Sequence, residues 1–157
     1  MKLKIFAVIA VLAGFAAFAA AGEVKINTAK VDGRLVDDIN LPFVNDPAVL
    51  GEWVSVDFVR EPAQFVPGER QFEGSLYLAG LTFLPKGKTP APWFGWTRGV
   101  VMHLGGDHTA SRYTIKEISG YKYMFFEWKS GDYIIRHQKP QYYVVQSPRY
   151  INPGFSR

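Results

Sequence analysis

After residue 74 the chain consists of short segments rich in apolar, aromatic and β-branched residues, some of which alternate with polar residues, and this pattern is typical of β-strands. Beyond an apolar run at the N-terminus, no stretch of ten residues shows the spacing of an amphipathic helix. Turn residues interrupt the pattern at Gly105-Gly106-Asp107, Ser119-Gly120 and Ser130-Gly131. The sequence therefore predicts strands over residues 53–59, 75–84, 93–104, 109–118, 121–129, 132–137 and 141–146.

About seven strands joined by short turns form an antiparallel meander, and a meander of this length tends to close because closure removes its exposed edges. A barrel of about eight strands encloses just enough room for side chains or one small ligand. We expect an all-β fold, an antiparallel up-and-down meander that closes into a small barrel. A two-sheet β-sandwich is the alternative.

The alternation also predicts which side chains share a face. In residues 53–59 we expect Val54, Val56 and Phe58 on one face, with Trp53, Ser55 and Asp57 on the other. In residues 75–84, one side should carry Tyr77, Ala79, Leu81 and Phe83.

Residues 121–136 are read as a hairpin with Ser130-Gly131 as its two-residue loop. One face then carries Tyr123, Phe125, Glu127, Lys129, Asp132, Ile134 and Arg136, and the other carries Met124, Phe126, Trp128, Tyr133, Ile135 and His137. We expect the aromatic face inside and the charged face in solvent. The alternative places Glu127 and Arg136 inside the barrel as a polar anchor for a ligand.

The N-terminal third of the chain is more irregular. Residues 22–40 mix charges with isolated apolar residues, which predicts a leader arm or linker with a turn at Asp32-Gly33 and at most one short strand. Asp46, Pro47 and Gly51 suit the cap, first position and exit of a single helical turn. Residues 60–70 predict a loop with one helical turn. The barrel domain should then span residues 41–147, with a tail over residues 148–157.

The first 21 residues have the composition of a signal peptide. Lys2 and Lys4 precede an apolar run over residues 5–21, and Ala19-Ala-Ala21 provides small residues for cleavage after Ala21. A retained membrane anchor is the alternative, since this run reaches the lower limit of spanning length. Without cysteine the chain has no site for a lipid anchor. We expect a periplasmic or secreted protein with no stable membrane insertion after cleavage.

Cleavage would leave 136 of the 157 residues, one ordinary domain that can bury a core without disulfides. It would also remove two lysines, so the formal charge falls from +4 to +2. No basic stripe remains, and we expect no nucleic-acid partner.

Two resemblances follow from local motifs. A capped turn followed by Gly51-x-Trp53 at the start of an antiparallel meander resembles the lipocalin and calycin signature. In that family the Trp closes one end of the barrel and a basic residue from a late strand packs across it. The resemblance implies that Arg136 packs across Trp53, and it implies that a small molecule binds in the barrel.

The second resemblance is closer in sequence. Residues 41–47, Gly51-Glu-Trp53, residues 127–136, Lys139-Pro140 and residues 142–144 are similar to an extracytoplasmic segment of bacterial membrane sensors of the β-lactam-regulator type. The chain lacks the His-Glu-x-x-His helix and the multi-span membrane region of those sensors. The resemblance implies a ligand-sensing or accessory domain without the signalling machinery.

Catalytic and metal motifs are weak. Ser119-Gly-Tyr-Lys122 matches the Ser-x-x-Lys of penicillin-recognising enzymes, but it falls on a turn where those enzymes need a helix. His103, Asp107 and His108 lack a further strong ligand for zinc. An acid–base pair would need Glu127 with either Asp57 or His103. We expect no catalytic residues, no metal and no cofactor, and we interpret the chain as not an enzyme.

Aromatic residues are abundant: without residues 1–21 the chain has nine Phe, eight Tyr and four Trp. They either fill the core or line a cavity. The candidate ligand-binding residues are Trp53, Phe83, Trp96, Phe126, Trp128, Tyr133, Glu127 and Arg136.

Two functions remain open. The first is a secreted or periplasmic lipocalin-like domain that binds a small apolar or amphipathic ligand in an aromatic-lined barrel. The alternative is a non-catalytic protein-interaction or sensory accessory module of the bacterial envelope, with an envelope protein as partner. The alternative predicts an exposed aromatic patch that includes Trp93, Phe94 and Tyr150.

Overall fold

A computed structural model describes residues 24–148, apart from the side chain of Asp132. The predicted signal peptide, most of the predicted tail and Tyr150 lie outside the described residues. Within residues 24–148, no helix is both long enough and apolar enough to span a membrane.

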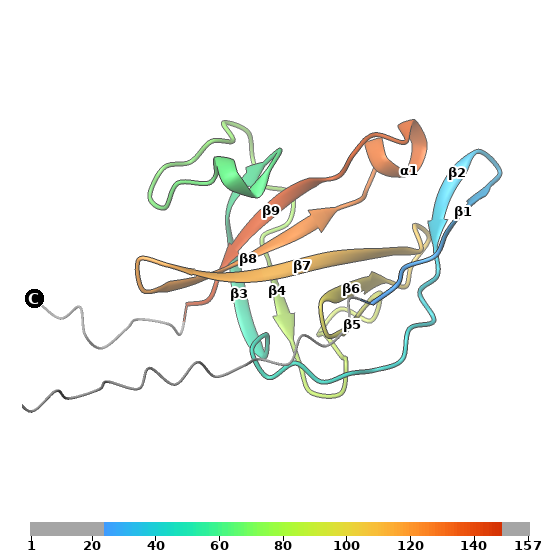
Figure 1. Cartoon of the computed structure of the whole chain (residues 1–157), viewed down its shortest axis with the longest axis horizontal. Coiled ribbons are helices and arrows are strands. Elements are labelled where there is room, and N and C mark those ends of the chain that lie inside the picture. The colour runs from blue at the N-terminus through green and yellow to red at the C-terminus, as the bar shows by residue number, and fades with distance from the viewer. Residues whose placement is uncertain (1–23, 149–157) are drawn as a thin grey trace, which may run out of the picture.

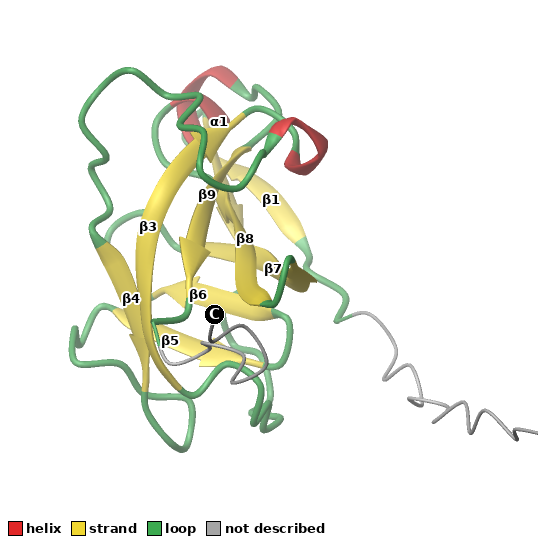
Figure 2. Cartoon of the chain, turned by 90° about the vertical axis from the view of Figure 1, so that its left-hand side faces the viewer, coloured by secondary structure: helices red, strands yellow, loops and turns green. Residues whose placement is uncertain are grey.

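Seven antiparallel strands form one curved sheet (Figures 1 and 2). They are β3 (Gly51–Val59), β4 (Gly80–Phe83), β5 (Phe94–Thr97), β6 (Val100–His103), β7 (Thr109–Ile118), β8 (Tyr121–Trp128) and β9 (Gln141–Gln146). Their order in the sheet is β4-β3-β9-β8-β7-β6-β5. Lys88 links the two edges, because it forms bridges to Leu84 just after β4 and to Gly95 in β5. The expected all-β fold with a small, nearly closed barrel is confirmed.

Two expected strands are wrong in extent. Residues 93–104 form the β5–β6 hairpin, because Gly99 adopts the left-handed conformation (φ 76°) that a tight turn needs. Of the strand predicted over residues 75–84, only β4 (Gly80–Phe83) is a strand. Residues 75–79 form an irregular segment before it, which we call the strap. Leu81 and Phe83 share the buried face as expected, but Tyr77 is 87% exposed.

Residues 132–136 form a short helix, α1 (Asp132–Arg136), and the predicted strand over residues 132–137 is wrong. The helix begins with a hydrogen bond from the Ile135 N–H to the Gly131 carbonyl and buries Ile134. The adjacent Ile134 and Ile135 favour a strand by propensity, but tertiary packing overrides that preference. β8 therefore pairs with β9, and Glu127 lies opposite Tyr142 instead of Ile134.

The predicted grouping of β3 side chains fails because a bulge interrupts the alternation, so Trp53 and Asp57 do not share one face. Trp53 is buried in the inner core, whereas Val54 is half exposed. The register against β9 then shifts between Ser55 and Asp57, which marks a β-bulge. Beyond the bulge Phe58 packs on the same inner core as Trp53, although the two were predicted on opposite faces, and Val59 belongs to an outer cluster.

The aromatic face of β8 is the inner one, as expected. Met124 and Phe126 belong to the barrel core, and Trp128 packs against it. Tyr123 and Phe125 are also buried, but on the outer side, where Phe65 covers them. Phe65 follows the 3-10 helix η1 (Pro62–Gln64) in the predicted loop.

Residues 24–40 contain two strands, so the expectation of at most one short strand before residue 41 is wrong. They contain the hairpin of β1 (Thr28–Val31) and β2 (Arg34–Asp37), which turns at Asp32-Gly33 as predicted. Val24, Ile26, Ile39 and Leu41 pack against a buried cluster of β6 and β7. The hairpin is therefore attached to the barrel.

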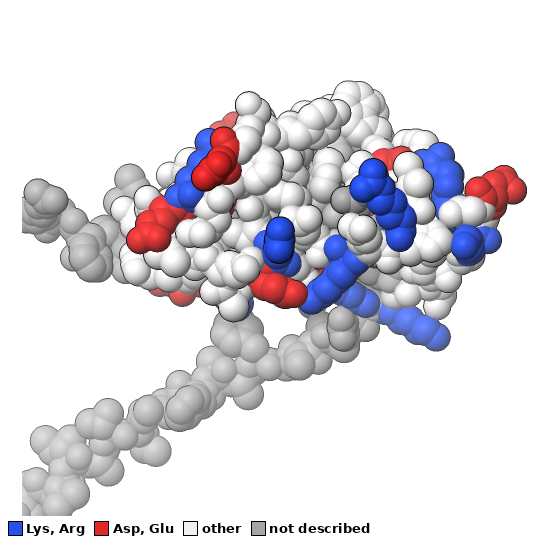
Figure 3. Space-filling model, turned by 90° about the horizontal axis from the view of Figure 1, so that it is seen from above, with Lys and Arg blue, Asp and Glu red and all other residues white. Residues whose placement is uncertain are grey.

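The expected capped turn at Asp46 is also present, since the Asp46 carboxylate accepts the N–H of Ala48. Charged side chains of both signs occur on the upper face of the molecule, with uncharged surface between them (Figure 3).

Candidate functional site

One end of the barrel is filled with side chains and the other is hollow. At the filled end, Trp53, Phe83 and Trp96 are each at most 3% exposed. The indole N–H groups of Trp53 and Trp96 donate to backbone carbonyls of Val49, and of Leu84 and Lys88, at 2.7–2.9 Å. Core packing and these hydrogen bonds account for the three aromatic residues without a bound ligand.

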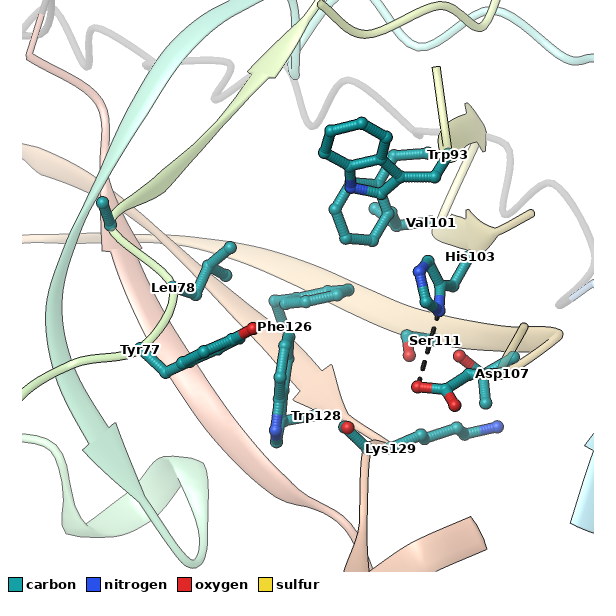
Figure 4. Close-up of a pocket in the computed structure, with 14 residues that line it drawn as sticks. Tyr77, Leu78, Trp93, Val101, His103, Asp107, Ser111, Phe126, Trp128 and Lys129 are labelled. Atoms are coloured by element: carbon teal, nitrogen blue, oxygen red, sulfur yellow. Dashed lines mark ion pairs between the residues drawn. The ribbon is translucent and has the colours of Figure 1, made fainter. Parts of the chain in front are cut away.

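The hollow end contains a cavity of about 230 Å³, bounded by the ends of β6 and β8, the starts of β5 and β7, and the 75–79 strap (Figure 4). Its lining residues are Tyr77, Leu78, Ala79, Trp93, Phe94, Val101, His103, Asp107, Thr109, Ser111, Phe126, Trp128, Lys129 and Ser130.

Aromatic rings form most of the apolar wall. Phe126 and Trp128 come from β8, with ring centroids 6.4 Å apart. Tyr77 on the strap packs against Trp128 at 6.1 Å, and Trp93 lies at the mouth with about half of its surface exposed. These rings give the cavity walls that an apolar ligand face can contact.

Hydroxyl groups form a polar wall on β7. Thr109 lies opposite His103 and Ser111 lies opposite the inward-facing Val101 in the β6–β7 pairing. Thr109 and Ser111 are only 6% and 4% exposed. Within residues 24–148 neither hydroxyl hydrogen-bonds to another protein group. Both residues line the cavity, so their hydroxyls can bond a molecule that occupies it.

The charges at the cavity are paired with one another. Asp107 lies 3.6 Å from His103 Nδ1 and 3.3 Å from Arg34, which belongs to the β1–β2 hairpin. The Lys129 side chain runs away from the aromatic rings (Figure 4), and its ammonium donates to Asp37 at 2.9 Å and to the Ala110 carbonyl at 2.7 Å. The cavity therefore presents balanced charge to a ligand.

The buried Asp37–Lys129 pair fastens the hairpin beside this end of the barrel. Burial alone raises the pKa of the Asp37 carboxyl, but hydrogen bonds from Thr28, Lys129 and the Ala110 N–H oppose it. Together with the positive charge of Lys129, they hold the pKa below its ordinary value. Asp37 is thus a charged structural group that positions the hairpin.

Of the eight candidate ligand-binding residues, Phe126 and Trp128 line the cavity. Trp53, Phe83 and Trp96 lie in the filled core with Phe126. Tyr133 is on α1, where its hydroxyl donates to Asp37 at 3.3 Å.

The structure does not bring Glu127 and Arg136 together in the barrel. The Glu127 carboxylate accepts the backbone N–H of Arg112 at 2.9 Å. Arg136 is exposed on α1, before the start of β9, whereas Trp53 lies beyond its other end. The prediction that Arg136 packs across Trp53 from a late strand is therefore wrong.

Several residues that line the cavity were not predicted from the sequence. Leu78 and Tyr77 lie on the irregular strap, and Thr109 and Ser111 look like ordinary strand residues. The alternation of β7 does place both hydroxyls on one face with Tyr113, and that face contributes Tyr113 to the barrel core. Strand register was the signal that could have found them.

The catalytic and metal motifs take ordinary structural roles. Ser119 and Gly120 both have positive φ in the β7–β8 turn, so Ser119 and Lys122 are not on a helix. Asp57 accepts three backbone N–H groups, from Phe58, Gln71 and Phe72. Among residues 24–148, no three His, Asp or Glu side chains lie close enough together to hold a metal ion.

Comparisons with known proteins find no match for this chain among protein-family models, curated proteins or solved structures. The cavity is therefore the feature of the molecule that points to a function.

Proposed function

We propose that the protein is a non-catalytic binding protein that holds a small amphipathic molecule in the open end of its barrel. One observation carries this proposal: a cavity of about 230 Å³ combines aromatic rings with two hydroxyls that line it and have no protein partner within the described residues. Mostly apolar walls with a few fixed polar groups are characteristic of small-molecule sites. The predicted secretion or periplasmic location remains a prediction of the sequence.

A fragment screen by NMR tests the proposal. Neutral, anionic and cationic compounds of about fifteen heavy atoms or fewer are added to 15N-labelled protein. We expect some of them to shift the Ser111 amide and the Trp128 indole N–H while leaving the Trp53 indole N–H unchanged.

The substitution Ser111→Leu provides the decisive variant, because it fills the cavity from β7. Thr114→Leu is its control, since Thr114 is exposed on the same strand. Binding should be lost in Ser111→Leu and kept in Thr114→Leu. If no compound shifts the Ser111 and Trp128 signals in the unmodified protein, the proposal is refuted.

A second candidate function is a protein-interaction or sensory accessory module of the envelope. Its support is that Trp93 and Leu104 are about half exposed and adjacent, with the Leu104 N–H donating to the Trp93 carbonyl at 2.7 Å. Phe94 from the same predicted patch is half-buried against the His103 ring. This function requires that Trp93→Ser abolish binding to an isolated partner while Tyr121→Ser, an exposed aromatic on β8, has no effect.

A further inference from the structure

We propose that the molecule bound in the cavity is an uncharged, hydroxyl-bearing ring of the size of one monosaccharide unit. This inference rests on the proposed binding function and specifies its ligand class. Three properties of the cavity lead to it: its volume, its charge balance and its combination of hydroxyl groups with aromatic rings.

The volume suits the enclosure of one ring. A cavity of about 230 Å³ is smaller than the pockets of about 300–1,000 Å³ that drug-sized ligands usually occupy. A six-membered ring with small substituents fits inside it, whereas a long acyl chain would extend beyond it.

The charge balance selects a neutral molecule. Asp107 is already close to both Arg34 and His103, and the Lys129 ammonium is bonded to Asp37 away from the aromatic rings. A carboxylate or ammonium ligand would lose hydration on entering the cavity and would find no unpaired partner of opposite charge among these groups.

Hydroxyls beside aromatic rings select a ring with hydroxyl groups on its edge. Thr109 and Ser111 present hydroxyls to the cavity from β7, and each can donate and accept a hydrogen bond. Phe126 and Trp128 lie beside them on the neighbouring strand β8, since Tyr113 of β7 pairs with Phe126, and they offer apolar surface to the C–H face of a sugar ring.

An NMR titration with defined probes tests this ligand class. The saccharide probes are glucose and N-acetylglucosamine; the competing probes are decanoate, choline and indole. We expect the saccharides to shift the Thr109 and Ser111 amides, with Kd of about 0.1–10 mM for ligands of this size. Decanoate and choline should leave these signals unchanged.

Two conservative variants remove the hydroxyls singly. Ser111→Ala and Thr109→Val should each weaken saccharide binding about fivefold, the usual effect of one lost hydrogen bond. Neither should shift the unfolding midpoint appreciably, because neither hydroxyl bonds to another described group. Thr114→Val on the outer side of β7 is the matched control and should bind as the unmodified protein does.

The outcomes separate this inference from the proposed function. Cavity shifts with decanoate, choline or indole but not with saccharides overturn the ligand class and leave the binding function standing. If Ser111→Ala and Thr109→Val both bind saccharides as strongly as the unmodified protein does, the assignment of these two hydroxyls to the ligand is overturned. If no compound shifts the cavity signals in this titration or in the fragment screen, both the ligand class and the proposed binding function are overturned.

Discussion

The Asp37–Lys129 ion pair gives the sharpest test of how the N-terminal hairpin is attached. The Lys129 ammonium lies 2.9 Å from the Asp37 carboxylate, with side-chain exposures of 8% and 0%. It also donates to the Ala110 carbonyl and lies 4.7 Å from the centre of the Tyr133 ring. Lys129→Met removes the charge and these contacts while retaining most of the length of the side chain.

We expect Lys129→Met to destabilise the fold by about 3 kcal/mol. Removing one partner of a buried pair typically costs about 3–5 kcal/mol, because the other charge stays buried. The lower end applies here, since Asp37 keeps the Thr28 hydroxyl at 2.6 Å and the Ala110 N–H at 2.9 Å. Against a total stability of about 5–15 kcal/mol for a domain, the effect is large.

The double substitution with Asp37→Asn should cost about 2 kcal/mol less than the sum of the two single substitutions, because no charge is then left buried without a partner. Urea unfolding followed by tryptophan fluorescence measures each free energy. Lys30→Met, at an exposed lysine of the same hairpin, is the control and should stay within about 0.5 kcal/mol of the unmodified protein. A cost below about 1 kcal/mol for Lys129→Met, or additive effects in the double variant, would refute the reasoning.

Three further predictions concern the same fold. Because the pKa of Asp37 is lowered on folding, its stabilisation is complete above the unfolded pKa of about 4 and is lost as the pH falls through the folded value; urea unfolding between pH 6 and pH 2 should therefore show a smaller decline for Asp37→Asn. Gly80→Ala would place a Cβ 2.3 Å from the Trp53 carbonyl oxygen and should cost about 2 kcal/mol or more in thermal unfolding, whereas Gly106→Ala, with open space around it, should be nearly neutral. Asp57→Ala leaves three backbone N–H groups without their acceptor and should increase hydrogen exchange in residues 71–72, with no such increase in β7.

The strands that the sequence predicted best are β7, β8 and β9. β7 has the predicted bounds and β8 ends one residue early, because the Ser119-Gly120 turn between them agrees with the strand pattern. β9 also has the predicted bounds, although its four central residues are a continuous apolar run without alternation. Local and tertiary preferences point to the same structure there.

The errors arise where a distant contact decides the structure. The bulge in β3 allows Trp53 to face inwards while Asp57 faces outwards to receive the N–H groups of residues 71–72. No local pattern shows that a loop fourteen or fifteen residues away supplies those donors. The same holds for α1, whose position depends on packing against β2.

The candidate site was only half predictable for a related reason. Phe126 and Trp128 were found because large aromatic residues on an inner face are conspicuous in the sequence. Thr109 and Ser111 were missed because their role depends on lacking a partner, and only the assembled barrel shows this. The 75–79 strap likewise gains its place from contacts such as the hydrogen bond from the Leu78 N–H to the Tyr143 hydroxyl.

The location of the cavity follows from side-chain size along β7. The inward positions of this strand run from Thr109 and Ser111 at the open end to Tyr113 and Ile115 further along. Tyr113 reaches the Phe83 ring at 6.0 Å and helps to fill the opposite end, whereas the two small residues leave space beside Phe126. Small residues at these two inward positions therefore create both the room for a ring and the hydroxyls that can bond its edge. A binding site that arises in this way should be removed by enlarging a single residue, which is why Ser111→Leu tests the proposed function directly.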